Sequence, residues 1–452
     1  MITHRYFDKK SIALKLLISI FFLFLAVTNV LAQPSVSYNL NSIPVNGNGN
    51  IGIGVGAVGS ITTGPNNVAV GHNALNKNTS GFNNVAVGFQ ALYNNNGVQN
   101  VAVGHLALSS NTGGWDNTAT GFQALSQNTS GNNNTANGSN ALLSNISGSN
   151  NTAVGRVSMS ANTTGSRNTA NGYLSLSSNT SGYDNTAIGI SALGGNISGT
   201  YNSASGGYAL GSNTTGSNNT ANGVDALYAN TTGYNNVANG MFAMENNGTG
   251  NNNTALGYSS LYSNTTGSKN TSIGDSAGFQ SLGSGNIFVG FRAGGKETGN
   301  NKMYIGNDSN KTLIYGDIST GQVLLGKPNP TAYIFKGTRT LNVIGGVLTD
   351  SIRIAFVANW ADYVFEKEYR LKPLDEVEQY IKANKHLPNI PAAEDIKRNG
   401  IDIATISAQL LEKIEELTLY IIDLKKENKD QFKNQQREIE KLKKQIRRLQ
   451  KK

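Results

Sequence analysis

A motif of 17 residues recurs through more than half of this 452-residue chain and limits the folds that the chain can adopt. The motif reads Asn-Thr/Val-Ala-x-Gly, and its glycine recurs from Gly54 to Gly306 with twelve spacings of 17 residues and three of 16. A unit this short cannot bury a core of its own. Successive units must stack on one another, which predicts a solenoid.

Each repeat, numbered from its asparagine, keeps the same residue types at the same positions. Position 5 is Gly and position 8 is Ala or Ser, and all but the last two copies have Ala at position 3 and Leu or Met at position 9. Because stacked coils lie about 4.8 Å apart, the asparagines at position 1 are expected to form a hydrogen-bonded ladder along the axis. These asparagines are Asn67, Asn84, Asn100, Asn117, Asn134, Asn151, Asn168, Asn185, Asn202, Asn219, Asn236, Asn253, Asn270 and Asn286.

The second half of the unit, usually Asn-Thr-Thr/Ser-Gly at positions 12 to 15, is also closed by glycine. Two extended runs that each end in glycine predict two strands and two turns per coil, because glycine supplies the positive φ of a tight corner. The constant Ala and Leu are expected to lie inside, and the variable positions 4, 6 and 7 outside. Sixteen such coils predict a rod of about 75 Å.

The predicted roll has a narrow interior, with small or medium apolar residues only at positions 3, 8 and 9. Long runs of Asn, Thr and Gly bury little apolar surface on folding. The stabilisation from this burial is therefore small compared with the backbone entropy that the runs lose. A single roll is therefore expected to require partner chains. Apolar residues at position 4, such as Val70, Ile188 and Leu256, are expected to cover a neighbouring subunit.

The repeat, as in NTAVG at Asn151–Gly155 followed by small and apolar residues, resembles the YadA-like head repeat of trimeric autotransporter adhesins. The resemblance covers residues 50–307. It implies a left-handed β-roll in each of three chains packed about one axis, and hence a homotrimer. The unit departs from that family in being longer, extended by the Asn-Thr-Thr-Gly half, and residues 308–452 are not expected to form the family's outer-membrane β-barrel. The secretion route therefore stays open.

The N-terminus has the pattern of a secretory signal peptide over residues 1–32. Basic residues precede an apolar run, Leu16–Val27, and Val30–Ala32 suits a cleavage site. An uncleaved anchor helix is the alternative, although the run is short for spanning a bilayer. Residues 33–49 are expected to be a linker. The mature chain is expected outside the cell or on the outer surface of a bacterium, with no membrane span.

The chain changes character after residue 307. Residues 308–358 contain alternating runs separated by Gly, Asn and Pro, which predict a β-rich neck that ends the solenoid. Residues 359–402 are expected to form a small α-rich module. Helical spacing of apolar residues predicts one short helix over Pro373–Asn384, and a second is expected from about Ala392 to Asn399, ended by Gly400. The string that begins WADYVF resembles a C-terminal module of secreted, tail-fibre-like bacterial surface proteins.

Residues 403–452 are expected to form one long helix. Apolar residues recur at spacings of three and four from Ile403 to Leu424 and again from Ile439 to Leu449, which is the pattern of a coiled-coil seam, and Asn and Gln occupy the seam between these two stretches. One chain has nothing to bury that seam against, so the helix also predicts an oligomer. Three strands agree with the resemblance of the head.

The net charge of +9 is concentrated at the two ends of the chain. Residues 33–310 contain seven basic and seven acidic residues, whereas Lys425–Lys452 contains twelve basic and four acidic ones. A neutral body does not predict a nucleic-acid groove. The basic tail is expected either to contact anionic envelope or lipid or to be the solvated face of a coiled coil.

The sequence does not predict an enzyme, a cofactor or a metal site. It has no cysteine and only four histidines, of which His72 and His105 are two coils apart at an outward position and give a weak metal-pair hypothesis. Acidic residues occur singly along the repeats rather than in the clusters that glycoside hydrolysis uses. Calcium-binding rolls need an Asp in each turn, which these repeats lack.

Four aromatic residues follow the second glycine of their coils at the same position: Phe82, Trp115, Tyr183 and Tyr234. An aromatic ring at a polar corner can stack on a sugar or hold a protein partner. These residues are therefore candidate ligand contacts, and packing at the subunit boundary is the alternative.

The expected function is attachment to a surface, a matrix polymer or another cell through many weak contacts along a stiff oligomeric rod. The adhesin expectation itself rests on the family resemblance. One alternative is binding to ice or another crystal, because Thr recurs at positions 2 and 13 at strand spacing. The other is a tail-spike-like fibre that binds or cleaves polysaccharide, although the carboxylate cluster for cleavage is missing.

Overall fold

The structure, a computed structural model, describes residues 49–308, 312–326, 340–343, 345, 347–352 and 360–450. The chain forms two compact units that divide between residues 346 and 347. The expected signal peptide (1–32), nearly all of the linker (33–49) and parts of the expected neck (308–358) lie outside the described residues.

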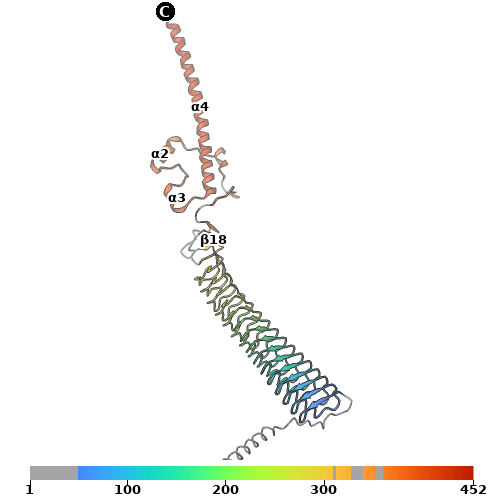
Figure 1. Cartoon of the computed structure of the whole chain (residues 1–452). Coiled ribbons are helices and arrows are strands. Elements are labelled where there is room, and N and C mark those ends of the chain that lie inside the picture. The colour runs from blue at the N-terminus through green and yellow to red at the C-terminus, as the bar shows by residue number, and fades with distance from the viewer. Residues whose placement is uncertain are drawn as a thin grey trace, which may run out of the picture. The chain divides into compact units, whose positions relative to one another are not determined.

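The first unit is a β-solenoid of short strands stacked along one axis (Figure 1). Each strand from β1 to β15 pairs in parallel with the next, and equivalent positions lie in register, as Ala119 with Ala136 and Ala136 with Ala153. The predicted solenoid of about sixteen coils is confirmed. The strands are β1 (Ile51–Ile53), β2 (Val68–Val70), β3 (Val85–Val87), β4 (Val101–Val103), β5 (Thr118–Thr120), β6 (Thr135–Asn137), β7 (Thr152–Val154), β8 (Thr169–Asn171), β9 (Thr186–Ile188), β10 (Ser203–Ser205), β11 (Thr220–Asn222), β12 (Val237–Asn239), β13 (Thr254–Leu256), β14 (Thr271–Ile273), β15 (Ile287–Val289), β16 (Lys302–Gly306), β17 (Thr312–Asp317), β18 (Gln322–Leu325) and β19 (Leu341–Val343).

Each coil has one strand, at positions 2 to 4, so the prediction of two strands per coil is wrong for the described coils. The rest of the coil is a chain of turns, yet its backbone still bonds along the axis. The N–H of Leu125 donates to Ala141 O at 3.0 Å, and that of Thr129 donates to Ile146 O at 2.9 Å. The N–H of Ser130 donates to the same Ile146 oxygen at 3.1 Å, so two successive N–H groups share one acceptor and the backbone bends here instead of forming a second strand.

A typical coil places three residues other than glycine in the left-handed region, at positions 7, 9 and 17. In one coil these are Gln123, Leu125 and Asn133, with φ of 54°, 52° and 56°. The left-handed conformation costs an L-residue about 1–2 kcal/mol. A coil therefore keeps this path only because the coils above and below it hold the backbone in place.

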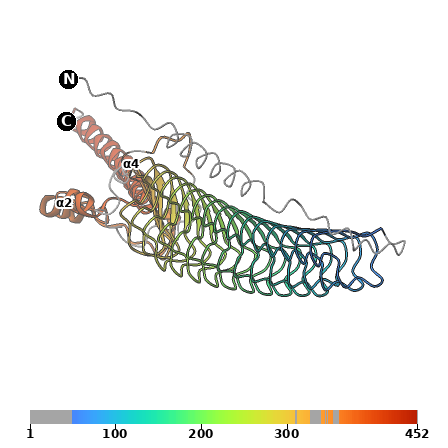
Figure 2. The same ribbon diagram turned by 60° about the horizontal axis from the view of Figure 1, so that its bottom comes forward.

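The core is a single column, to which each coil contributes small side chains and one larger side chain. Ala119, Ala124 and Leu125, at positions 3, 8 and 9, are all 0% exposed, and their equivalents in the other coils are buried in the same way. Figure 2 shows the narrow coils that result. The prediction that the constant Ala and Leu lie inside is confirmed.

The last coils change their core residues in a compensating way. Leu at position 9 is replaced by Gly278 and, in the next coil, by Gly294, and Phe288 replaces Ala at position 3 of the same coil as Gly294. A Cβ on either glycine would lie within 2.6 Å of the Phe288 ring. The ring therefore occupies the volume that leucines fill in the earlier coils.

The parallel stack ends where β17 pairs antiparallel with β16, and β18 pairs antiparallel with β17. Lys302 and Asp317 join the first antiparallel pair through a 2.7 Å ion pair. Burial raises the pKa of Asp317, but hydrogen bonds from Lys302 and Ser319 outweigh it and hold that pKa below its ordinary value. The reversal of direction stops another parallel coil from being added to this edge.

The second unit contains the helices η2 (Ala361–Phe365), α2 (Leu374–Asn384), α3 (Ala393–Asn399) and α4 (Ile403–Leu449). The three α-helices lie where the sequence predicts them, whereas the short η2 helix was not predicted. Asp402 caps α4 by accepting a hydrogen bond from the N–H of Thr405 at 2.8 Å. η2 packs against α4 through the buried side chains of Ala361 and Val364.

Adjacent glycines in one coil offer a matched test of close axial packing. A Cβ on Gly114 would lie 2.4 Å from Gly131 O of the next coil, whereas a Cβ on Gly113 would meet nothing within 4 Å. We expect Gly114→Ala to destabilise the solenoid by about 1–3 kcal/mol and Gly113→Ala to change its stability by less than about 0.5 kcal/mol. Thermal unfolding followed by circular dichroism measures both, and equal effects would contradict close packing of the coils at Gly114.

Candidate functional site

The asparagines at position 1 form the predicted ladder in the interior of the solenoid. Asn168 Nδ2 donates to Asn151 Oδ1 at 3.2 Å and to Gly182 O of its own coil at 2.8 Å. The Asn168 backbone N–H donates to the same Asn151 oxygen at 3.0 Å. The side-chain amide bonds repeat from Asn67 to Asn236, and the backbone bonds to the preceding amide oxygen continue to Asn286.

A second ladder, which was not predicted, runs through the asparagines at position 12. Asn162 Nδ2 donates to Asn145 Oδ1 at 2.8 Å and to Gly165 O at 2.9 Å. Both columns are 0% exposed at these coils. The signal that reveals this column is the recurrence of its asparagine every 17 residues, the same signal that identified the first.

Both ladders meet the glycine at position 15, whose carbonyl accepts from both amides of its coil, as at Gly165. A Cβ on Gly165 would lie 2.4 Å from Asn162 Oδ1 and from the oxygen of Gly182 in the next coil. This glycine lacks the positive φ that was predicted for it, whereas Gly172 at position 5 has φ of 147°. Close approach of neighbouring coils, rather than backbone conformation, requires glycine at position 15.

The four predicted ligand-contact aromatics lie at one corner of the coil, just before the strand, but in separate coils. Phe82, Trp115, Tyr183 and Tyr234 are 40%, 43%, 39% and 47% exposed. They are two to four coils apart in the repeat, so they do not form one pocket. Because whole coils separate them, no ring of this set meets another of the four.

Tyr183 is the member of this set with the most elaborate surroundings. Arg167 forms a two-pronged ion pair with Asp184, with Nε–Oδ1 at 2.7 Å and Nη2–Oδ2 at 2.8 Å. The Arg167 guanidinium lies 5.6 Å from the centre of the Tyr183 ring, and Tyr201 meets Tyr183 edge to face at 5.4 Å. The group is exposed, and the hydrogen bond from Arg167 holds the pKa of Asp184 below its ordinary value.

A stacked column of rings at position 6 was not predicted. His72, Phe89, His105 and Phe122 lie in successive coils with ring centres 5.0–5.4 Å apart and planes within 14° of parallel. Phe89 separates the two histidines, so the weak hypothesis of a His72–His105 metal pair is wrong. Because the rings cover each other's faces, the column turns ring edges outward, which suits apolar contact better than stacking on a sugar.

The outward face of the parallel sheet carries positions 2 and 4. In β5 to β9 position 2 is an exposed Thr, whereas position 4 varies between polar residues such as Asn137 and apolar ones such as Val154 and Ile188. Both positions are apolar together toward the two ends, in the valines of β2 to β4 and in Ile287 and Val289 of β15. The Thr residues at position 13 are engaged within the stack, because Thr129 and Thr163 donate their hydroxyls to carbonyls of the next coil at 3.0 and 2.9 Å.

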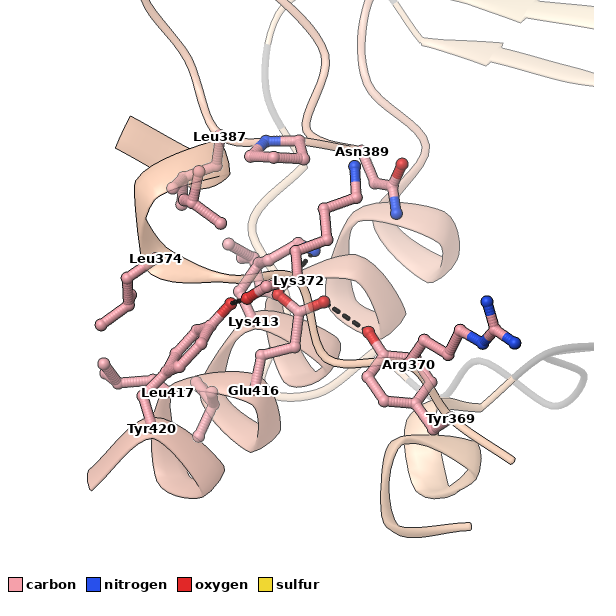
Figure 3. A pocket seen from close by; sticks show the side chains of 14 residues that line it. Tyr369, Arg370, Lys372, Leu374, Leu387, Asn389, Lys413, Glu416, Leu417 and Tyr420 are labelled. Carbon is pink, nitrogen blue, oxygen red and sulfur yellow. Dashed lines mark hydrogen bonds and ion pairs between the residues drawn. The ribbon is translucent and has the colours of Figure 1, made fainter. Parts of the chain in front are cut away.

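The second unit has a groove of about 650 Å³ between α4, α2 and the segments beside them. Figure 3 places Leu374, Leu387 and Leu417 on one side of it and Tyr369 and Asn389 on the other. The polar groups beside the groove bond to one another: Tyr369 donates to Glu416, and Tyr420 donates to the backbone oxygen of Lys372. The apolar lining consists mainly of Leu374, Val377, Leu387, Pro388, Leu410, Ile414 and Leu417.

The charges below the groove also satisfy one another. Lys413, only 11% exposed at its side chain, contacts Glu412 at 2.7 Å and Glu416 at 2.8 Å. Burial raises the pKa of Glu412, but hydrogen bonds from Lys413, Tyr363 and Asn389 outweigh it and lower that pKa overall. The hydrogen bond to Glu412 raises the pKa of Tyr363 to about 12. The groove thus offers apolar surface rather than a reactive group.

The predicted seam of α4 is uncovered in the single chain. Apart from Ile406, which is half-buried, its apolar residues are 48–73% exposed, although they repeat along most of a 47-residue helix. Three of them also line the groove, so the seam and the groove form one continuous apolar surface. The seam residues are Ile403, Ile406, Leu410, Ile414, Leu417, Ile421, Leu424, Ile439, Leu442, Ile446 and Leu449.

No three potential metal-ligating side chains come together in the described part of the chain. Within the same residues, no helix is long and apolar enough to cross a bilayer. Neither the models of known protein families nor the curated proteins match this sequence.

The buried ladder can be tested with two substitutions that add the same charge to one coil. Asn168→Asp replaces the donating NH₂ by a carboxylate that faces two acceptor oxygens, whereas Asn171→Asp changes an exposed residue at position 4. We expect the first to destabilise the solenoid by about 3 kcal/mol and the second to be nearly neutral, measured by thermal unfolding at pH 7.

The pH dependence separates this mechanism from a packing defect. Burial raises the pKa of the introduced carboxyl in the folded state, so its destabilisation should shrink as the pH falls and the protonated form again donates a hydrogen bond. A loss in Asn168→Asp that is the same at pH 4 and pH 7 would contradict the ladder's role.

Proposed function

We propose that this protein is a secreted, adhesin-like fibre on a bacterial surface that attaches through repeated weak contacts along a homotrimeric rod. The observation that carries the proposal is the division of each coil into a constant interior and a variable, exposed exterior. A uniform stack holds many outward side chains at fixed spacing, which is the geometry that multivalent binding requires.

Support for an oligomer comes first from α4. The apolar seam is about half exposed along a long helix of the single chain. Packing against the seams of other helices would remove this apolar surface from water and stabilise the helix. The apolar groove is continuous with that seam, so partner helices on the seam would also cover part of the groove. Three strands are proposed because they match the symmetry implied by the resemblance of the repeats.

The solenoid supplies a second support. Its sheet face is apolar at positions 2 and 4 toward both ends, and in the middle coils exposed Thr at position 2 accompanies a mixture of Asn and apolar residues such as Val154 and Ile188 at position 4. We propose that the subunit contact lies on this face, with continuous apolar packing at the two ends and separate apolar contacts among hydrated Thr and Asn in between. The single aromatic rings at the corner, Phe82, Trp115, Tyr183 and Tyr234, then provide the proposed ligand contacts.

Ice or crystal binding is a second candidate, favoured by the exposed Thr at position 2 in five successive coils. The array is incomplete, because position 4 varies and the position-13 hydroxyls bond within the stack. A thermal-hysteresis assay separates the two candidates: clear hysteresis at micromolar protein would favour the crystal-binding function.

The oligomer is tested on the seam of α4. We expect the mature chain to sediment as a trimer and the double substitution Leu442→Asp/Ile446→Asp to weaken or abolish association, because it buries charge in the seam. The matched control is Asn434→Asp/Gln436→Asp, which adds the same charge off the seam and should leave the trimer intact. A monodisperse, folded monomer of the unsubstituted chain would contradict the proposal.

Attachment is tested on an array of glycans and matrix proteins. We expect the trimer to retain a ligand from the array and the seam variant to lose at least about a hundredfold in apparent affinity, because multivalency is lost. Trp115→Ala should reduce binding without changing the sedimentation of the trimer. The proposal of adhesion fails if monomer and trimer bind every array component equally weakly.

A further inference from the structure

The distal half of α4 carries an excess of positive charge that its own acidic residues do not neutralise. Residues 425–450 contain ten Lys and Arg, all exposed, but only four Asp and Glu. Four of the lysines form ion pairs with acidic residues three positions earlier. Within the described helix, no ion pair engages the other six: Lys425, Lys429, Arg437, Lys444, Arg447 and Arg448.

These six cations lie on one face of the helix. At 3.6 residues per turn they fall within an arc of about 140°, whose centre is about 150° from the centre of the apolar seam residues Ile439, Leu442, Ile446 and Leu449. From Lys425 to Arg448 the face extends for about 35 Å. The helix thus has an apolar face and, nearly opposite to it, a cationic face. It can associate with other helices through the apolar seam while the cationic face stays exposed to solvent.

The charge is local to this helix rather than a property of the whole chain. The solenoid and its flanks, residues 33–310, carry seven basic and seven acidic residues and are neutral. Electrostatic attraction of a polyanion at physiological salt acts over about 8 Å. A polyanion that meets the protein is therefore attracted to the α4 face and not to the coils.

We propose that the cationic face of α4 binds a linear anionic polysaccharide, with acidic sugar groups lying along the row of unpaired lysines and arginines. The proposal rests on the oligomeric fibre proposed above, in which the seams are mutually covered. The cationic faces of the helices in such an oligomer then point outward in different directions. A flexible polymer can contact several of these faces, whereas a flat bilayer can contact the oligomer on one side only. A membrane-surface helix would also need its apolar face for the lipid.

The test compares two triple variants with the same change in charge and composition. Lys429→Gln/Arg437→Gln/Lys444→Gln removes cations from the α4 face. The matched control, Lys367→Gln/Lys385→Gln/Arg398→Gln, removes exposed cations elsewhere in the same unit. Binding of the full mature chain to polygalacturonate, a uronic-acid polymer, is measured at about 0.05 and 0.3 M salt, with neutral dextran as the negative probe.

We expect the unsubstituted chain to bind polygalacturonate but not dextran, and to lose at least about tenfold in affinity between the two salt concentrations. The α4 variant should lose at least about tenfold at low salt, and the control variant less than about threefold. Equal losses in the two variants would overturn the proposal, because they would show a response to net charge alone. Binding only to anionic lipid vesicles would overturn it as well.

Sedimentation of each variant keeps this inference separate from the proposed function. Loss of polymer binding in an intact trimer concerns the α4 face alone, whereas a monomeric unsubstituted chain would contradict the fibre.

Washing producing cells with about 0.5 M salt distinguishes a polysaccharide of the producing cell from one in its surroundings. If salt releases the unsubstituted protein from washed cells, and the α4 variant is not retained on them at low salt, the polymer belongs to the cell's own envelope.

Discussion

Two columns of buried side-chain amides hold the coils of this solenoid together, and the rest of its architecture depends on them. Each amide donates to the coil before it and to a glycine carbonyl of its own coil, as Asn168 and Asn162 do. The bonds to the preceding coil exist only in a stack. The left-handed residues at positions 7, 9 and 17 add to this dependence, because an isolated coil would have no neighbour to hold them.

The same constraint explains where variation is possible. Positions 1, 3, 5, 9, 12 and 15 face the interior or a neighbouring backbone, so their residue types are fixed by hydrogen bonds, volume or close approach. Positions 2, 4, 6 and 16 face outward and differ from coil to coil. A binding surface can therefore change along the rod without disturbing the stack, and the proposed attachment uses that freedom. The switch from Leu to Gly around Phe288 shows that even the core changes only through compensating substitutions.

Much of the fold follows from periodicity alone. The period predicts the stack, the first ladder, the inward Ala and Leu, and the outward position 4, because each depends on translation by one coil. The path of the backbone within a coil does not follow from the period. Left-handed φ at Leu125 and its equivalents turns the chain after the strand, although leucine does not favour that region. Where a second strand was expected, successive N–H groups such as those of Thr129 and Ser130 share one acceptor oxygen, and the backbone bends. The asparagine ladder at position 12 was within reach of the sequence, since its recurrence is as regular as that at position 1.

The candidate sites were less accessible from sequence. The column of His72, Phe89, His105 and Phe122 depends on which rings meet across coils, and the set of variable outward residues does not show that. The groove of the second unit depends on contacts between residues 23 to 49 positions apart, such as Asn389 and Tyr363 with Glu412. The seam of α4, by contrast, is a local pattern with helical period, and the sequence predicted it residue by residue.

Side-chain amide hydrogen exchange, followed by NMR on the mature protein, tests the central claim most directly. If buried amides hold the stack, the Nδ2 protons of the asparagines at positions 1 and 12 exchange orders of magnitude more slowly than those of exposed asparagines at position 4, such as Asn171. Equal, rapid exchange at all three positions would show that the amide columns are open to water, and would contradict their role in holding the coils together.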